Sequence, residues 1–234
     1  KGGEDDEFDP EEFAKNIPYF QFFTHPVSLT LFLNSWTFGF IGFTLLSEMP
    51  SFFTDNLGFD LASAGVLCVF PYLSLFISSI SFGLLFEYLQ NHYDWSTNKV
   101  RQVAQYIAYV GSASGLIICG FMDQKYVAYV FMIFTQLLMG AAQAGLGCAF
   151  SDVAPNYSSA LNSVGNTIGA VAGIVGPLVV AQFTTSFEGA WGWRLSFFVT
   201  GFFAAISLIF WSIYQTSEPV PALNLPSTRK KISF

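Results

Sequence analysis

Polar side chains occur at several points inside otherwise apolar stretches of the chain, and they are the residues best suited to contact a polar ligand. Amides and hydroxyls in such surroundings lose free energy unless they meet water, a ligand or one another. The pattern therefore predicts either a polar cavity or a set of hydrogen bonds that joins neighbouring segments. The candidates for lining a cavity are Asn34, Thr37, Tyr72, Gln143, Asn166 and Thr167.

Charged residues at the ends of these stretches form a second candidate group. Lys99 and Arg101 follow Glu87 across a short polar segment, and Asp152 ends a later apolar stretch. Opposite charges at neighbouring helix ends can pair in one conformation and separate in another. We therefore expect Arg101 to pair with Glu87 as a latch, with Asp152 as a further acceptor. The alternative is a set of solvated charges that contribute at most about 1 kcal/mol each.

Residues that support covalent or metal-dependent chemistry are not arranged for it. Cys68, Cys119 and Cys148 lie in apolar segments at spacings that match no metal-binding motif. His25 and His92 have no neighbouring set of ligand residues. The sequence contains no HExxH, GxSxG or Walker motif. We therefore expect no enzyme, no metal site and no tightly bound cofactor.

The composition argues against a soluble protein. Of the 234 residues, 53% are hydrophobic and only 11% are charged, whereas about a quarter are charged in soluble domains. The net charge of −7 comes mostly from residues 4–12, which hold seven of the 16 acidic side chains. No cluster of Lys and Arg suits nucleic acid, so we expect no nucleic-acid partner.

Charged residues divide the chain into six long uncharged stretches. Each is long enough to cross a hydrocarbon core, which requires about 20 residues in a helix. Because lipid offers the backbone no hydrogen-bond partners, such stretches predict helices rather than strands. The predicted spans are residues 26–47, 61–86, 102–122, 126–151, 153–187 and 195–217. The fold class is therefore an all-α membrane protein, a bundle of six transmembrane helices in a lipid bilayer.

The positive charges predict which side of the membrane holds each end. With both termini in the cytoplasm, seven of the nine Lys and Arg residues lie inside and only Lys125 and Arg194 lie outside, as the positive-inside rule favours. We divide the chain into an acidic cytoplasmic linker at 1–22, the bundle at 23–218 and a cytoplasmic tail at 219–234. Because the chain begins with Lys rather than Met, we expect a further segment upstream.

The fifth stretch carries glycines at helical spacing. Gly165, Gly169 and Gly173 recur every four residues, and Gly176 follows them. Small residues on one face let helices approach closely in lipid, where no hydrophobic effect drives helices together. The stripe predicts packing against a neighbouring helix that either is static or allows that helix to rock. In the second stretch, Pro71 removes a backbone hydrogen bond and predicts a kink.

Several motifs resemble those of the anion:cation symporter family of the major facilitator superfamily, which includes sialin, vesicular glutamate transporters and phosphate transporters. The sequence GLLFEYL at 83–89 is similar to the family's GxxADxL, with Gly83 in place and Glu87 at the usual Asp position. STNKVR at 96–101 resembles STxxVR. DVAPNY at 152–157 and the glycine-rich helix after it resemble DIAPRY followed by NTxGxxxGI.

The resemblance covers residues 17–218, but only the second half of a twelve-helix fold. It implies the C-terminal six-helix half of a transporter, whose partner is an N-terminal half of six helices. A small anion such as phosphate, sialate or glutamate would cross between the halves by alternating access, coupled to H+ or Na+. The residues Gly83, Glu87, Arg101 and Asp152 would take part in gating. The first span contains no Arg, which argues against a vesicular glutamate transporter in particular.

The alternative is a six-helix membrane fragment or scaffold that binds a partner without transport, in which the small-residue faces serve assembly alone. Either protein would be a multi-pass membrane protein, and the sequence does not choose between the plasma membrane and the membrane of an organelle or vesicle. An upstream segment with six further spans would separate the two alternatives.

Overall fold

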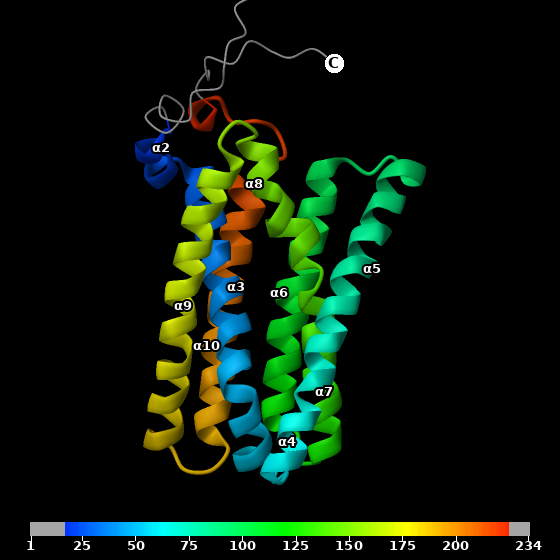
Figure 1. Ribbon diagram of the computed structural model, residues 1–234, viewed down its shortest axis with the longest axis vertical. Coiled ribbons are helices and arrows are strands. Elements are labelled where there is room, and N and C mark those ends of the chain that lie inside the picture. The colour runs from blue at the N-terminus through cyan, green and yellow to red at the C-terminus, as the bar shows by residue number, and fades with distance from the viewer. Residues whose placement is uncertain (1–16, 225–234) are drawn as a thin grey trace, which may run out of the picture.

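Six long helical spans form the fold in a computed structural model, which describes residues 17–224 (Figure 1). Among these residues there is no strand. The spans are Pro26–Asn56, Leu61–Tyr93, Thr97–Phe121, Lys125–Val153, Ser158–Ser186 and Trp191–Tyr214. The predicted fold class, an all-α bundle of six membrane-spanning helices, is therefore confirmed.

Three of the spans are composite helices. The first joins α3 (Pro26–Ser51) to the π-helical turn η1 (Phe52–Asn56), and the second joins α4 (Leu61–Leu67) to α5 (Val69–Tyr93). The fourth combines α7 (Lys125–Met139), the π-helical turn η2 (Gln143–Gly147) and α8 (Cys148–Val153). The remaining spans are single helices: α6 (Thr97–Phe121), α9 (Ser158–Ser186) and α10 (Trp191–Tyr214).

Local sequence signals set where two of the helices begin. Asp60 Oδ2 accepts a hydrogen bond from the N–H of Ser63 at 2.9 Å, which caps α4. Hydrogen bonds from the side chain and the backbone of Ser63 also lower the pKa of Asp60. Ser96 caps α6 in the same way, by accepting from the N–H of Lys99 at 3.3 Å. The turn before it begins at Asp94, whose φ of 52° is left-handed, a conformation that Asp tolerates better than most residues.

The second span is interrupted where Pro71 predicts a kink. α4 ends at Leu67 and α5 begins at Val69, because Pro71 has no N–H to donate to the carbonyl of Leu67, four residues earlier. That carbonyl instead accepts a hydrogen bond from Tyr129 Oη on α7 at 3.1 Å. A side chain of the neighbouring helix thus satisfies the backbone group that the proline leaves free.

The glycine stripe of α9 packs against α3. A Cβ atom added at Gly169 would lie 3.0 Å from the carbonyl oxygen of Ser35, and one added at Gly173 would lie 2.5 Å from the ring of Phe43. A Cβ added at Gly39 on α3 would overlap the backbone of Gly169. The two backbones therefore approach as closely as the stripe predicts, and no larger residue fits between them.

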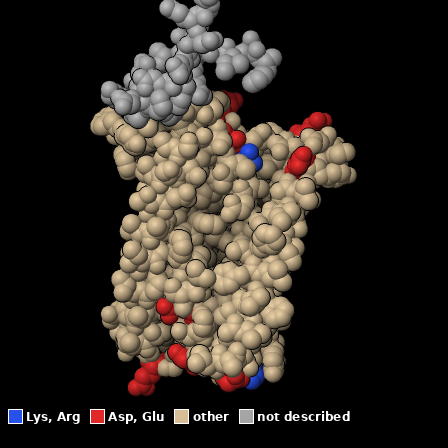
Figure 2. All heavy atoms as spheres, viewed as in Figure 1, with Lys and Arg blue, Asp and Glu red and all other residues tan. Residues whose placement is uncertain are grey.

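The helices form two groups that meet at α3, α6 and α10. Figure 1 shows α9, α3 and α10 grouped on one side and α6, α7 and α5 on the other. The helix α2 (Tyr19–Thr24) and the short helix η3 (Pro221–Leu223) lie at one end of the bundle, which we call the α2 end; the opposite end is the α4 end. In Figure 2 the charged side chains lie near these two ends, and the middle of the face is uncharged.

Residues assigned from the sequence to the linker and the tail partly belong to the folded bundle. Phe22 in α2 and Leu223 in η3 are fully buried. Val153 O accepts hydrogen bonds from Val220 N at 2.9 Å and from Asn224 Nδ2 at 2.7 Å. Apolar residues that flank the spans therefore cover the α2 end. The rest of the predicted linker and tail, residues 1–16 and 225–234, lies outside the described residues.

Candidate functional site

A cleft opens where α3, η2, α8 and α9 meet. Its cavity volume is about 370 Å³, and its lining contains no charged side chain. Figure 2 shows the middle of the bundle hollowed in this view and free of Lys, Arg, Asp and Glu. The lining residues are Ser35, Phe38, Gly39, Phe43, Ala142, Gln143, Leu146, Gly147, Phe150, Asn162, Gly165, Asn166 and Gly169.

Two of the predicted cavity residues, Gln143 and Asn166, do line this cleft. They belong to two different elements, η2 and α9, and both side chains are exposed. Thr167 is exposed next to Asn166 but does not line the cleft, and its hydroxyl donates to the carbonyl of Ser163 at 2.9 Å. The amides can therefore donate to and accept from a ligand, whereas the hydroxyl of Thr167 is already bonded within its own helix.

The predicted cavity residues Asn34 and Thr37 belong instead to the interior of the bundle, where both are fully buried. Asn34 Nδ2 donates to the carbonyls of Thr30 at 2.9 Å and Ser207 at 3.4 Å. Asn34 Oδ1 accepts from Gln105 Nε2 at 3.0 Å, and the hydroxyls of Thr37 and Ser207 share a hydrogen bond of 2.6 Å. These side chains link α3, α6 and α10, because polar groups in an apolar interior bond to one another.

Tyr72 is also placed away from the cleft. It lines a separate groove between α5 and the end of α3, together with Met49, Pro50 and Cys68. Met49 and Pro50 belong to the end of α3, so Tyr72 lies by that helix end and not in the wall formed by η2 and α9. Its assignment to the same cavity as Gln143 is therefore corrected.

Sequence reasoning did not single out the apolar part of the lining. Phe38, Phe43 and Phe150 form much of the cleft wall, but the chain contains 28 Phe residues, and no local signal marks these three. Ser35 and Asn162, by contrast, belong to the polar residues in apolar stretches that predict a cavity, and both line the cleft. The cleft thus presents amides beside aromatic rings.

The π-helical turn η2 is held from behind by two side chains of α6. Arg101 Nη1 donates to the carbonyl of Ala144 at 2.8 Å, and Gln105 Oε1 accepts from the N–H of Leu146 at 3.1 Å. A π-turn disturbs the regular helical hydrogen bonds and is frequent at functional sites. In this chain the disturbed backbone lies in the cleft wall itself.

Arg101 pairs with Asp152 rather than with Glu87. Its Nε donates to Asp152 Oδ2 at 2.7 Å and its Nη2 to Asp152 Oδ1 at 3.4 Å. Glu87 is exposed, and the only ion pair within residues 17–224 is the one between Arg101 and Asp152. The expected partner of Arg101, Glu87, is therefore wrong for this structure, and the partner is Asp152. Gly83 is exposed, and a Cβ added there would meet no atom within 4 Å.

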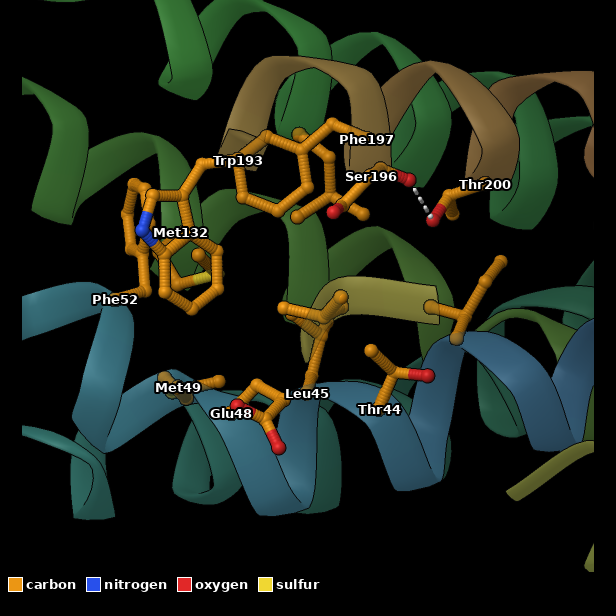
Figure 3. A pocket seen from close by; sticks show the side chains of 13 residues that line it. Thr44, Leu45, Glu48, Met49, Phe52, Met132, Trp193, Ser196, Phe197 and Thr200 are labelled. Atoms are coloured by element: carbon orange, nitrogen blue, oxygen red, sulfur yellow. Dashed lines mark hydrogen bonds between the residues drawn. The ribbon is translucent and has the colours of Figure 1, made fainter. Parts of the chain in front are cut away.

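A second, more enclosed pocket lies between α3 and α10 toward the α4 end. Figure 3 shows Glu48 on one side of it and Ser196 on the other, with the rings of Phe52 and Trp193 at one end. Those two rings meet edge to face at 5.2 Å. The hydroxyl of Ser196 donates to the carbonyl of Gly192 at 2.8 Å, whereas the buried hydroxyl of Thr44 has no hydrogen-bond partner among residues 17–224. No group of three His, Cys, Asp or Glu side chains within 17–224 could hold a metal ion.

Comparison with known proteins gives the family. The family profile described as Major Facilitator Superfamily matches residues 3–177. Vesicular glutamate transporter 2.2 of Danio rerio is 28% identical over 208 residues, which are 87% of this chain and 35% of that protein. Vesicular glutamate transporter 1 of Bos taurus is 26% identical over 88% of this chain and 37% of its own length. An uncharacterized transporter of Caenorhabditis elegans, slc-17.2, is 26% identical over 90% of this chain and 43% of its own.

The chain therefore spans well under half the length of these relatives. The relatives are transporters, which agrees with the expectation that the chain is not an enzyme. They also confirm the resemblance to the anion:cation symporters that the motifs at 83–89, 96–101 and 152–157 indicate. A profile match over most of the chain, six membrane-spanning helices and these relatives lead to one conclusion: the chain belongs to the major facilitator superfamily, and its fold is a six-helix half of that architecture.

Proposed function

We propose that the chain is one half of a secondary transporter that moves a small organic or inorganic anion by alternating access. The observation that carries the proposal is the uncharged polar cleft in the membrane-spanning part of the bundle. Exposed amides at this depth are unfavourable in lipid unless they meet water, a ligand or protein. A cleft that opens on one face suits a substrate that passes between this bundle and a second one.

The cleft contributes hydrogen bonds rather than charge. Gln143 and Asn166 can each donate two amide N–H groups to a carboxylate or phosphate oxygen. No lining residue is Lys or Arg, so we assign the positive charge that attracts the anion to a partner half of six further helices. That assignment agrees with the relatives, which are much longer than this chain.

Orientation and coupling complete the proposal. We place the α2 end in the cytoplasm, because Lys99 and Arg101 begin α6 there, whereas Lys125 and Arg194 lie at the α4 end. H+ or Na+ is the proposed coupling ion, and the pair of Arg101 and Asp152 is the proposed gating contact at the cytoplasmic side. No described residue of the cleft titrates, so ion coupling is assigned to groups outside the cleft lining.

Uptake into proteoliposomes tests the proposal. The complete protein that carries these six helices is reconstituted, and labelled phosphate, glutamate and sialic acid are offered under imposed H+ and Na+ gradients. We expect one of these anions to accumulate, and Gln143→Leu or Asn166→Leu to reduce its uptake about tenfold through loss of buried hydrogen bonds to the substrate.

The matched control is Gln182→Leu, which removes an amide from α9 outside the cleft, where its Nε2 donates to Ser186 Oγ at 2.9 Å. We expect this variant to transport normally. If no anion accumulates under either gradient while the protein is folded, the chain is a scaffold rather than a transporter half. If Gln182→Leu is as impaired as Asn166→Leu, the cleft does not carry the substrate.

A further inference from the structure

Gln105 on α6 lies behind the cleft and contacts two of its walls. Its Oε1 accepts from the N–H of Leu146 at 3.1 Å, and its Nε2 donates to Asn34 Oδ1 at 3.0 Å. Leu146 lines the cleft from η2, and Asn34 directly precedes Ser35, which lines it from α3. One fully buried amide therefore joins the backbone of one wall to a side chain of the other, and we call this contact the Gln105 bridge.

The wall formed by η2 depends on such a contact more than a regular helix would. A π-turn leaves backbone groups short of regular partners, and buried backbone groups need partners. Besides the bridge, the carbonyl of Ala144 accepts from Arg101 at 2.8 Å. Between these two bonds lies Gly145, where an added Cβ would lie only 2.5 Å from Gln105 Oε1. The side chain of Gln105 thus occupies the space that a side chain at position 145 would need.

The other end of the bridge is equally well fixed. Asn34 is oriented by its own bonds to the carbonyls of Thr30 and Ser207, so its Oδ1 is directed at Gln105. Tyr109 Oη donates to the carbonyl of Asn34 at 2.6 Å, which holds the α3 backbone at the same level. Because both ends are held, the length of the Gln105 side chain sets the separation of η2 from α3.

We propose that Gln105 is a positioning residue of the transport cleft, which fixes η2 against α3 and so sets where Gln143 meets the substrate. The inference rests on the proposed function. Gln105 does not line the cleft, so it acts through Leu146 and Asn34. Without the amide, a buried N–H and a buried carbonyl oxygen lose their partners, and the two walls must shift to replace them.

Transport kinetics give the first test. In Gln105→Leu we expect the KM for the transported anion to rise about tenfold, with a smaller change in kcat. The matched control is Gln102→Leu on the same helix, since the Gln102 amide donates to Gln215 Oε1 at 3.2 Å, away from the cleft. We expect Gln102→Leu to leave the KM unchanged. The conservative variant Gln105→Glu keeps the acceptor for Leu146 and has at most one O–H for Asn34 in place of the two amide N–H groups, so its KM should be intermediate.

A distance measurement gives a second test that does not require transport. Spin labels are placed on the native Cys148, which is exposed directly after η2, and on Phe43→Cys in α3, with Cys68→Ser and Cys119→Ala as background. We expect Gln105→Leu to shift or broaden the distance distribution between the labels, and Gln102→Leu to leave it unchanged. Gln105→Glu carries the test if Gln105→Leu does not fold.

The two tests separate the bridge from the proposed function. If the unmodified protein moves no anion but the distribution changes in the Gln105 variants, the bridge stands and the transport assignment fails. If the anion is transported and the Gln105 variants change neither the KM nor the distribution, the positioning role is wrong. If the Gln105 variants gave less folded protein but left the KM unchanged, Gln105 would contribute to helix packing alone, and the positioning role would again be wrong.

Discussion

The interior junction of α3, α6 and α10 and the cleft between α3, η2 and α9 use the same kinds of side chain in opposite ways. In the interior, Asn34 and Gln105 are fully buried and bonded to each other. In the cleft, Gln143 and Asn166 are exposed to open space. Both pairs are amides in membrane-spanning segments. The availability of a partner, rather than residue type, therefore separates an amide that holds helices together from one that can bind a ligand.

A single helix supplies both environments. α3 directs Asn34 and Thr37 toward α6 and α10, whereas Ser35 and Gly39 face the cleft. Successive residues on a helix are separated by about 100°, so neighbouring positions in the sequence reach opposite sides of the same wall. A shift of α3 is consequently transmitted to both regions, which is the property that a rocking bundle requires.

The largest expected effect comes from the close packing that forms the back of the cleft. Gly39→Ala should lower the free energy of unfolding by about 3 kcal/mol, because the new Cβ overlaps the backbone of Gly169, which cannot move aside as a side chain can. Thermal unfolding of the purified protein in detergent measures the loss. This change would show that the cleft is as rigid at its back as the interior junction.

The control for that prediction is Gly42→Ala, one turn further along α3, where an added Cβ meets no atom within 4 Å. We expect it to be neutral or to stabilise by up to about 1 kcal/mol, since Ala favours the helix more than Gly does. If Gly39→Ala and Gly42→Ala destabilised the protein equally, the loss would come from any substitution in α3 rather than from the contact with Gly169. The close packing at the back of the cleft would then not be supported.

The next largest effect tests the contrast between the two sets of amides directly. Asn34→Leu should destabilise the bundle by about 1–2 kcal/mol, because it leaves the Nε2 of Gln105 without its acceptor in an apolar interior. Asn166→Leu should leave the stability unchanged within about 0.5 kcal/mol while it reduces uptake. The melting temperature and the uptake rate are measured for both variants. If the two substitutions destabilised the bundle equally, the distinction between structural amides and ligand-binding amides would be wrong.

Much of the fold could be predicted from the sequence because its signals are local. Six uncharged stretches set the six spans, Pro71 set the break between α4 and α5, and the stripe that begins at Gly165 set the close approach of α9 to a neighbour. The spans follow from the length of each uncharged stretch, the break from the missing N–H of proline, and the close approach from the absence of a Cβ in glycine. None needs knowledge of which helix lies beside which.

The candidate site was harder to predict because it depends on helix pairing. The sequence marks Asn34 and Asn166 equally, since both are amides in apolar stretches. Asn34 is structural because the neighbouring helices bring Ser207 and Gln105 within hydrogen-bond distance of it. The partner of Arg101 was ambiguous for the same reason: Glu87 is near in sequence, whereas Asp152 is near in space. The π-turn η2 has no local signal beyond the glycines at 145 and 147.

The smallest expected effect concerns the charge pair at the α2 end. Asp152→Asn should lower the free energy of unfolding by about 1 kcal/mol, since the side chains of Arg101 and Asp152 are only 13% and 18% exposed and two hydrogen bonds join them. The matched change Glu87→Gln should have no measurable effect, because Glu87 is exposed and pairs with no Lys or Arg among residues 17–224. A double-mutant cycle with Arg101→Gln and Asp152→Asn measures the coupling by chemical unfolding. A coupling near zero, or one as large for Glu87 as for Asp152, would contradict the pairing, and the α2 end would then be closed by the apolar cover of α2 and η3 alone.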